Sequence, residues 1–308
     1  MKTLENALES YFGTRRALGF RLDQSERLLR QFVAFLKTKQ SDYVTTDLAL
    51  EFSKNCRATP TRWARRLGTI RLFCRYVHAI DPRTELPPDR IFHRGDSRAR
   101  PYIFSEKDIY RLVEACKAIT LGELRNATYS TLLGLIAVTG MRVGEAIKLE
   151  DRDLDLAAGV LTIREAKFNK WRQVMLHRST VDELKRYQRL RNQLRPVRKI
   201  PNFVSGHRGG QLRHVTIHGI FVLALRRIGL DKQKGGQNPR IHCLRHSFAV
   251  NTLIRWYREG DDVEQRLPLL STYMGHISPN STYWYLSAVP ELMQLAASRL
   301  EKQMGGVA

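Results

Sequence analysis

The segment Ile241 to Val250, with the sequence IHCLRHSFAV, places two histidines and an arginine within five residues. On a helix, His242 and His246 would share a face four residues apart, as in a two-histidine metal site. Together with Arg245 they could instead hold a phosphate. A third interpretation is that they are satisfied polar residues at the start of a helix. The segment alone does not choose among these three.

The metal interpretation fails at its catalytic position. A zinc protease needs a glutamate beside the first histidine, and Cys243 stands there instead. His276 could add a third ligand for some other metal, but no carboxylate cluster accompanies it. The four cysteines form no C-x-x-C pair, and we interpret them as reduced core residues. We therefore expect neither a metal nor any other cofactor.

Two further segments favour the phosphate interpretation. TGMRVGEAIKL, starting at Thr139, contributes Arg142 and Glu145, and YMGHISPNSTYWYL, starting at Tyr273, contributes His276 and Tyr285. Arginine stays charged at any working pH and can donate paired hydrogen bonds to phosphate oxygens. The segments together suggest a phosphate site.

In these residues the chain resembles the tyrosine recombinase family, which includes the phage integrases. Members of that family carry T-G-x-R-x-x-E, then H-x-x-R, then a G-H pair, with a tyrosine nine residues after the last histidine. The matching positions here are Thr139-Gly140-Met141-Arg142 with Glu145, His242 with Arg245, Gly275-His276, and Tyr285. The family also has a lysine in a hairpin turn about 25 residues after the first arginine, where this chain has Lys167. The resemblance covers residues 100–290.

The resemblance implies a role for each of these residues. Arg142 and Arg245 would neutralise the non-bridging oxygens of a five-coordinate phosphorus. Tyr285 would attack that phosphorus and form a 3′-phosphotyrosyl bond, which conserves the energy needed for rejoining, so no ATP is required. His242 would take the tyrosine proton. Lys167 would protonate the leaving 5′ oxygen.

One more catalytic residue, two supporting residues and three rival residues complete the expected site. His276 would contact a non-bridging oxygen or position the tyrosine. Glu145 would buttress Arg142, and His246 would support the catalytic residues without contacting the phosphate. Tyr273 and Tyr283 compete with Tyr285 for the part of nucleophile, and Lys170 competes with Lys167. Spacing from the G-H pair favours Tyr285.

The net charge of the chain also indicates a nucleic-acid partner. Lys and Arg outnumber Asp and Glu by 52 to 30, giving +22, of which +9 lies in residues 1–100 and +13 in residues 101–308. Such an excess implies a polyanionic partner for both parts of the chain. Between Arg57 and Ile80 there is no acidic residue, and we expect phosphate contacts from one set of arginines there: Arg62, Arg65, Arg66, Arg71 and Arg75.

The spacing of apolar residues predicts a mainly α (α+β) chain of two domains. A helical domain spans residues 1–95, a linker 96–101 ends a segment with four prolines (residues 81–101), and a mostly helical domain spans 102–308. The resemblance implies that the first domain clamps DNA and that the second is catalytic. Strands over 160–163 and 173–176 predict a small antiparallel sheet. A last helix spans 290–304 and packs either on its own domain or on a neighbouring subunit.

We expect a site-specific recombinase of a mobile genetic element, acting as a tetramer on double-stranded DNA, with possible accessory proteins. The alternatives are a DNA-binding regulator that does not cut and a type IB topoisomerase-like enzyme that relaxes DNA. No apolar run reaches the roughly 18 residues that span a membrane, so we expect a cytoplasmic protein. Residues 256–265 look like an insertion in the family pattern.

Overall fold

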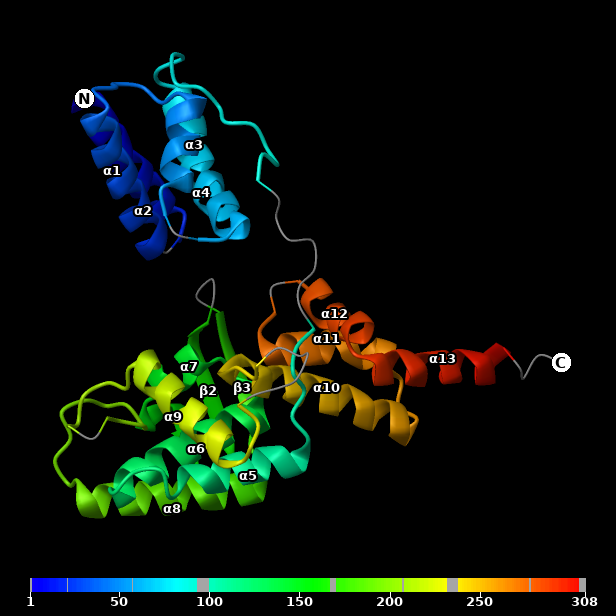
Figure 1. The fold of residues 1–308 in the computed structure, drawn as a ribbon. Coiled ribbons are helices and arrows are strands. Elements are labelled where there is room, and N and C mark those ends of the chain that lie inside the picture. Colours follow the sequence, from blue (N-terminus) through cyan, green and yellow to red (C-terminus); the bar gives the residue numbers. More distant parts are fainter. Residues whose placement is uncertain are drawn as a thin grey trace. The chain divides into compact units, whose positions relative to one another are not determined.

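The computed structural model describes residues 2–20, 22–56, 58–92, 100–166, 170–206, 208–231, 238–276 and 278–304. The chain divides into two compact units, residues 1–99 and 100–308, which are described separately below (Figure 1).

The first unit is helical in its described part. Its helices are α1 (Lys2–Ala17), α2 (Asp23–Thr38), α3 (Thr46–Lys54) and α4 (Pro60–His78). Helix α4 packs against each of the other three and carries the core of the unit. Proline at its first position suits a helix start, since the fixed backbone angle is already helical and the missing N–H would have had no partner within the helix. Leu67, Ile70, Cys74 and Val77 recur along one face of α4 and are buried, as the apolar spacing predicts.

The second unit holds most of the helices and the described sheet. Its elements are α5 (Glu106–Cys116), α6 (Glu123–Thr139), α7 (Val143–Lys148), η1 (Asp151–Asp153), β1 (Leu154–Asp155), β2 (Val160–Ala166), β3 (Lys170–Met175), α8 (Arg178–Leu194), α9 (His214–Arg227), α10 (Ile241–Glu259), α11 (Val263–Met274), α12 (Asn280–Ala288) and α13 (Pro290–Met304). The three strands form an antiparallel sheet in the order β1-β2-β3. The prediction of a mainly helical fold with a small antiparallel sheet is confirmed.

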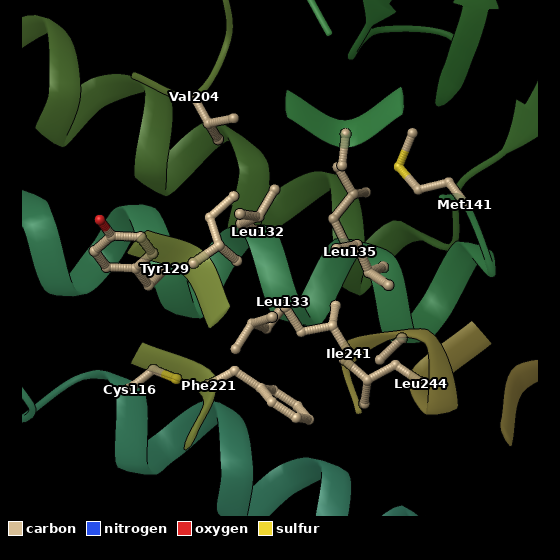
Figure 2. Packing of buried hydrophobic residues seen from close by; sticks show 14 of the residues in the cluster. Cys116, Tyr129, Leu132, Leu133, Leu135, Met141, Val204, Phe221, Ile241 and Leu244 are labelled. Atoms are coloured by element: carbon tan, nitrogen blue, oxygen red, sulfur yellow. The ribbon is translucent and has the colours of Figure 1, made fainter. Parts of the chain in front are cut away.

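Helix α6 lies at the centre of the larger core in this unit. Figure 2 shows its Tyr129, Leu132, Leu133 and Leu135 among side chains of the surrounding elements. The neighbours include Ile241 and Leu244 of α10 and Met141, which follows α6 directly. Because Met141 precedes Arg142 and Leu244 precedes Arg245, burial of these two apolar residues fixes the backbone that carries both arginines.

A second core cluster joins the last four helices. Ala249, Val250 and Leu253 of α10 are buried with residues of α11 and with Tyr285 and Leu292 of α12 and α13. Helix α13 spans the predicted residues 290–304 and packs against α10 and α12 of the same chain. Arg258 Nη2 lies 2.8 Å from Glu291 Oε1, which pairs α10 with the start of α13. The residues 256–265 form the end of α10, a left-handed turn at Gly260 and the start of α11.

In the described part of the chain, no helix is both long and apolar enough to cross a membrane.

Candidate active site

Arg142 stands at the N-cap of α7, between the end of α6 and the start of the next helix. Its backbone N–H donates to Glu145 Oε2 (2.8 Å), and its Nη1 donates to Glu145 Oε1 (2.8 Å). Its Nη2 donates to the carbonyl of Gly275 (2.9 Å). These bonds fix the orientation of the guanidinium, while about a third of the side chain stays open to solvent. Glu145 therefore fixes the orientation of Arg142.

Arg245 is buried, with 1% of its surface exposed, on the first turns of α10. Its Nη1 donates to the carbonyl of Gly140 (2.6 Å) and its Nη2 donates to the carbonyl of Met274 (2.7 Å). Burial, and then the charge of nearby Arg142, lowers the pKa of Arg245 to about 10. The guanidinium is still positive at neutral pH. Since it has five N–H groups, donors remain for a further acceptor.

The carbonyls that accept from the two arginines lie at the ends of helices α6 and α11. Each helix closes on a glycine in the left-handed conformation, Gly140 (φ +62°) after α6 and Gly275 (φ +64°) after α11. Such a cap leaves carbonyls at the negative end of the helix dipole, where cations are stabilised. The glycines of the T-G-x-R and G-H motifs thus create the places where Arg142 and Arg245 are held.

Tyr285 lies on α12, and its hydroxyl is hydrogen-bonded to His246 Nδ1 at 2.8 Å. Only 1% of Tyr285 is exposed. The His246 ring also contacts the rings of His242 and Trp284, with centroids 4.6 Å and 5.7 Å away. From the sequence we expected His242 to take the tyrosine proton and His246 to give support. In the structure the described hydrogen bond of the hydroxyl is to His246, while His242 lies one turn earlier on α10 and is exposed.

His276 follows the Gly275 cap, beside the tyrosine. Its Nδ1 is hydrogen-bonded to Thr282 Oγ1 at 2.7 Å, and its ring is roughly parallel to that of Tyr285 with centroids 6.4 Å apart. Thr282 is fully buried. The loop from α11 to α12 therefore brings His276 close to Tyr285.

Arg172, which was not predicted from the sequence, lies on β3 with 9% of its side chain exposed. Its Nη1 and Nη2 donate to the two carboxylate oxygens of Glu145, at 3.2 and 2.7 Å. Burial raises the pKa of Glu145, but the hydrogen bond and charge of Arg172, with smaller contributions from Arg142, bring it below its ordinary value. The local sequence does not distinguish Arg172 from Lys170, the other basic residue of β3.

The two rival tyrosines have different surroundings. Tyr273 stacks on Phe248, with rings 5.5 Å apart and an interplanar angle of 17°. Burial raises the pKa of Tyr273 to about 12, against a smaller opposing effect of Arg172. Tyr283 is 48% exposed. Of the three tyrosines, Tyr285 is the one with a described hydrogen bond to a histidine of the H-x-x-R-H segment.

Neither lysine candidate can be placed. Lys167 lies outside the described residues, and Lys170 begins β3 with a side chain that is not described. Among the side chains that are described, no three His, Cys, Asp or Glu residues gather as a metal site would require.

The five arginines of α4, in the first unit, fall into two groups. Arg66 donates to the carbonyl of Phe52 (2.9 Å) and lies over the Phe52 ring, and Arg71 pairs with Asp89. Asp89 lies beyond the acid-free stretch, so the sequence did not reveal this partner. The other three, Arg62, Arg65 and Arg75, lie at least partly open to solvent.

Comparison with known proteins identifies the family of the chain. Residues 103–291 match the model of the phage integrase family. The chain is 43% identical to the putative integrase/recombinase y4rB of Sinorhizobium fredii, covering 98% of each protein. It is 29% identical to the tyrosine recombinase XerC of Thermodesulfovibrio yellowstonii, covering 73% of this chain and 70% of the relative.

The fold is also that of a solved integrase. A lambda integrase tetramer bound to a Holliday junction has a chain that superposes with a TM-score of 0.58 at 16% identity, covering 90% of this chain and 78% of that one. The family model and the y4rB similarity both span the segments that hold Arg142, Arg245 and Tyr285. The chain belongs to the phage integrase family, the tyrosine recombinases.

Proposed function

We propose that this protein is a site-specific DNA recombinase that cuts and rejoins strands through a 3′-phosphotyrosyl intermediate. The observation that carries the proposal is the meeting of two fixed arginines with a tyrosine whose hydroxyl is bonded to a histidine. A regulator that only binds DNA would not need this arrangement, and the relatives of this chain are named as integrases and recombinases.

The two arginines would supply the positive charge that neutralises the transition state. Arg142 is partly open to solvent and is oriented by Glu145 and Gly275, so an incoming phosphate would meet a guanidinium that is already aligned. Arg245 has five N–H groups, of which two are described as donating to the carbonyls of Gly140 and Met274. His242, exposed three residues before Arg245, is proposed as a further donor to the same phosphate.

The 2.8 Å contact favours His246 as the group that receives the tyrosine proton. With the ring proton on Nε2, Nδ1 accepts from the phenol, and attack of the phenolate oxygen on phosphorus breaks the bond to the 5′ oxygen. We retain Lys167 as the proton donor to that oxygen and His276 as the residue that positions Tyr285. The reverse transfers would accompany rejoining.

Burial of Tyr285 implies a rearrangement on DNA binding. With 1% of the residue exposed, its oxygen cannot reach a phosphate until α12 shifts relative to α10. We propose that binding to DNA and to neighbouring subunits provides this shift. Met293 and Leu300 of α13 are more than half exposed and would give a neighbouring subunit an apolar contact.

The proposed assembly is a tetramer on two DNA sites; the lambda integrase structure is itself named as a tetramer bound to a Holliday junction. The helical first unit would hold the duplex through Arg62, Arg65 and Arg75. A mobile genetic element as the source and the cytoplasm as the compartment, where bacterial DNA lies, remain part of the proposal.

The test is strand exchange by the purified protein on duplexes that it selects from a random pool. Two duplexes of different length that share the selected site should yield recombinant lengths without ATP and in the presence of a chelator. Relaxation of supercoiled plasmid without recombinant products would instead indicate topoisomerase activity. Binding with neither product would refute the proposal.

A further inference from the structure

Arg172 forms the centre of a closed ring of contacts behind the candidate site. Its two terminal nitrogens donate to the two carboxylate oxygens of Glu145, which also receives the side chain and backbone N–H of Arg142. Arg142 in turn donates to the carbonyl of Gly275. The ring joins β3, α7 and the end of α11, three elements that are separated in the sequence.

The ring closes because Gly275 lies directly against Arg172. A Cβ added to Gly275 would lie 2.8 Å from Arg172 Nη1 and 3.1 Å from its Cζ, closer than real side-chain contacts allow. The guanidinium therefore occupies the space where another residue type would carry its side chain. The same glycine accepts a hydrogen bond from Arg142 through its carbonyl.

Glu145 accepts hydrogen bonds from both arginines. Glu145 is 10% exposed, and each of its oxygens receives one bond from Arg142 and one from Arg172. Without Arg172, no other described hydrogen bond would hold the carboxylate on the side away from Arg142. If the Glu145 carboxylate could rotate, it would no longer fix the orientation of the Arg142 guanidinium.

We propose that Arg172 is a positioning residue for strand cleavage: through Glu145 and Gly275 it holds the Arg142 guanidinium where a non-bridging phosphate oxygen will lie. This inference rests on the proposed function. Arg172 has 9% of its side chain exposed and acts through these two neighbours, so no contact with DNA is assigned to it.

The test compares Arg172→Met and Arg172→Lys with a control, Arg152→Met, in which the replaced arginine is 68% exposed and pairs with Glu150. The measurements are affinity for the selected duplex and the rate of covalent adduct formation on that duplex nicked beside the cleavage position. We expect both Arg172 variants to bind within about threefold of wild type but to form adduct about 100-fold more slowly, because a misplaced catalytic group costs about that much. The control should match wild type in both. Lysine should not rescue the rate, since it lacks the paired geometry of the guanidinium.

A modified substrate separates positioning from a general structural defect. Replacing one non-bridging oxygen at the cleavage position by methyl removes the charge that Arg142 would neutralise. On one of the two diastereomers of this substrate, the Arg172 variants should form adduct less than about tenfold more slowly than wild type, instead of roughly 100-fold more slowly. A decrease of equal size on both diastereomers and on normal DNA would overturn the proposal, as would cleavage by Arg172→Met at the wild-type rate.

A double-mutant cycle on melting temperature tests the ring of contacts independently of the proposed function. The melting shifts of Arg142→Met and Arg172→Met should not add in the double variant, because both arginines bind one carboxylate. If wild type forms no adduct, the proposed function fails, while non-additive shifts would still support the ring of contacts. Additive shifts would refute the ring whatever the enzyme does.

Discussion

Substituting Gly140 by alanine should destabilise the second unit and misplace Arg245. Gly140 has a φ of +62°, where an L-residue is disfavoured by about 1–2 kcal/mol. The new Cβ would lie 2.5 Å from Cδ1 and 3.0 Å from Cγ of the Phe248 ring, so the ring must move. Phe248 is stacked on Tyr273 and has little freedom to do so.

The expected magnitude is the sum of these two effects. Overpacking of this kind costs about 1–3 kcal/mol, so the total is about 2–5 kcal/mol. For a domain of this size, each kcal/mol lowers the melting temperature by about 2–4 °C, which predicts a decrease of roughly 4–20 °C. The Gly140 carbonyl accepts from Arg245, so adduct formation should also slow.

Gly144 provides a control within the same motif. It lies inside α7, and a Cβ there would meet nothing within 4 Å. Gly144→Ala should therefore be neutral or stabilising by up to about 1 kcal/mol, the helix preference of alanine over glycine. Calorimetry of both variants is the assay. If Gly140→Ala melts as high as Gly144→Ala, the left-handed cap at Gly140 does not require glycine and the reasoning is refuted.

Three further outcomes follow from described contacts. Charge-removing substitutions at Arg62, Arg65 or Arg75 should weaken DNA binding, and the slope of log affinity against log salt should fall by about 0.9 for each phosphate that the variant no longer neutralises. Arg66→Gln should mainly lower the melting temperature, because Arg66 bonds the Phe52 carbonyl. Equal salt slopes for all four variants would contradict this grouping. Tyr273→Phe should still form the covalent adduct, since burial keeps the pKa of Tyr273 at about 12 and its phenol stays protonated; absence of the adduct would reassign the nucleophile. The pKa of Glu145 lies below its ordinary value of 4.5, so the ionised carboxylate stabilises the fold above that pH, and this stabilisation is lost as the pH falls through the lowered pKa. Acid unfolding of Glu145→Gln should therefore depend less on pH. An unchanged pH profile would argue against the pairing with Arg172.

The motif spacing predicted which segments meet but not how each side chain is held. The segments that carry Arg142, Arg245 and Tyr285 were recognised from their order in the sequence, and α13 spans the predicted residues 290–304. The sequence motif assigned the tyrosine proton to His242, whereas the described hydrogen bond is to His246. Both histidines lie on α10, and which of them meets Tyr285 depends on how α12 packs against α10. Arg172 was missed for a similar reason: its partner Glu145 is 27 residues away, and only the fold of the sheet against α7 brings them together.

Basic residues were the least predictable part of the chain. A stretch without acids suggested five exposed arginines on α4, but Arg71 finds Asp89 after the helix has ended and Arg66 finds a backbone carbonyl. Long side chains reach partners that are distant in the sequence, so local charge counts overstate the surface available to DNA.

The central claim is that Tyr285 becomes covalently joined to DNA. The protein should be incubated with its selected duplex nicked beside the cleavage position, digested with protease and nuclease, and its peptides examined by mass spectrometry. We expect a nucleotide-bearing peptide with the modification on Tyr285, and no adduct from Tyr285→Phe. A modification on another residue, or an adduct that persists in Tyr285→Phe, would contradict the claim.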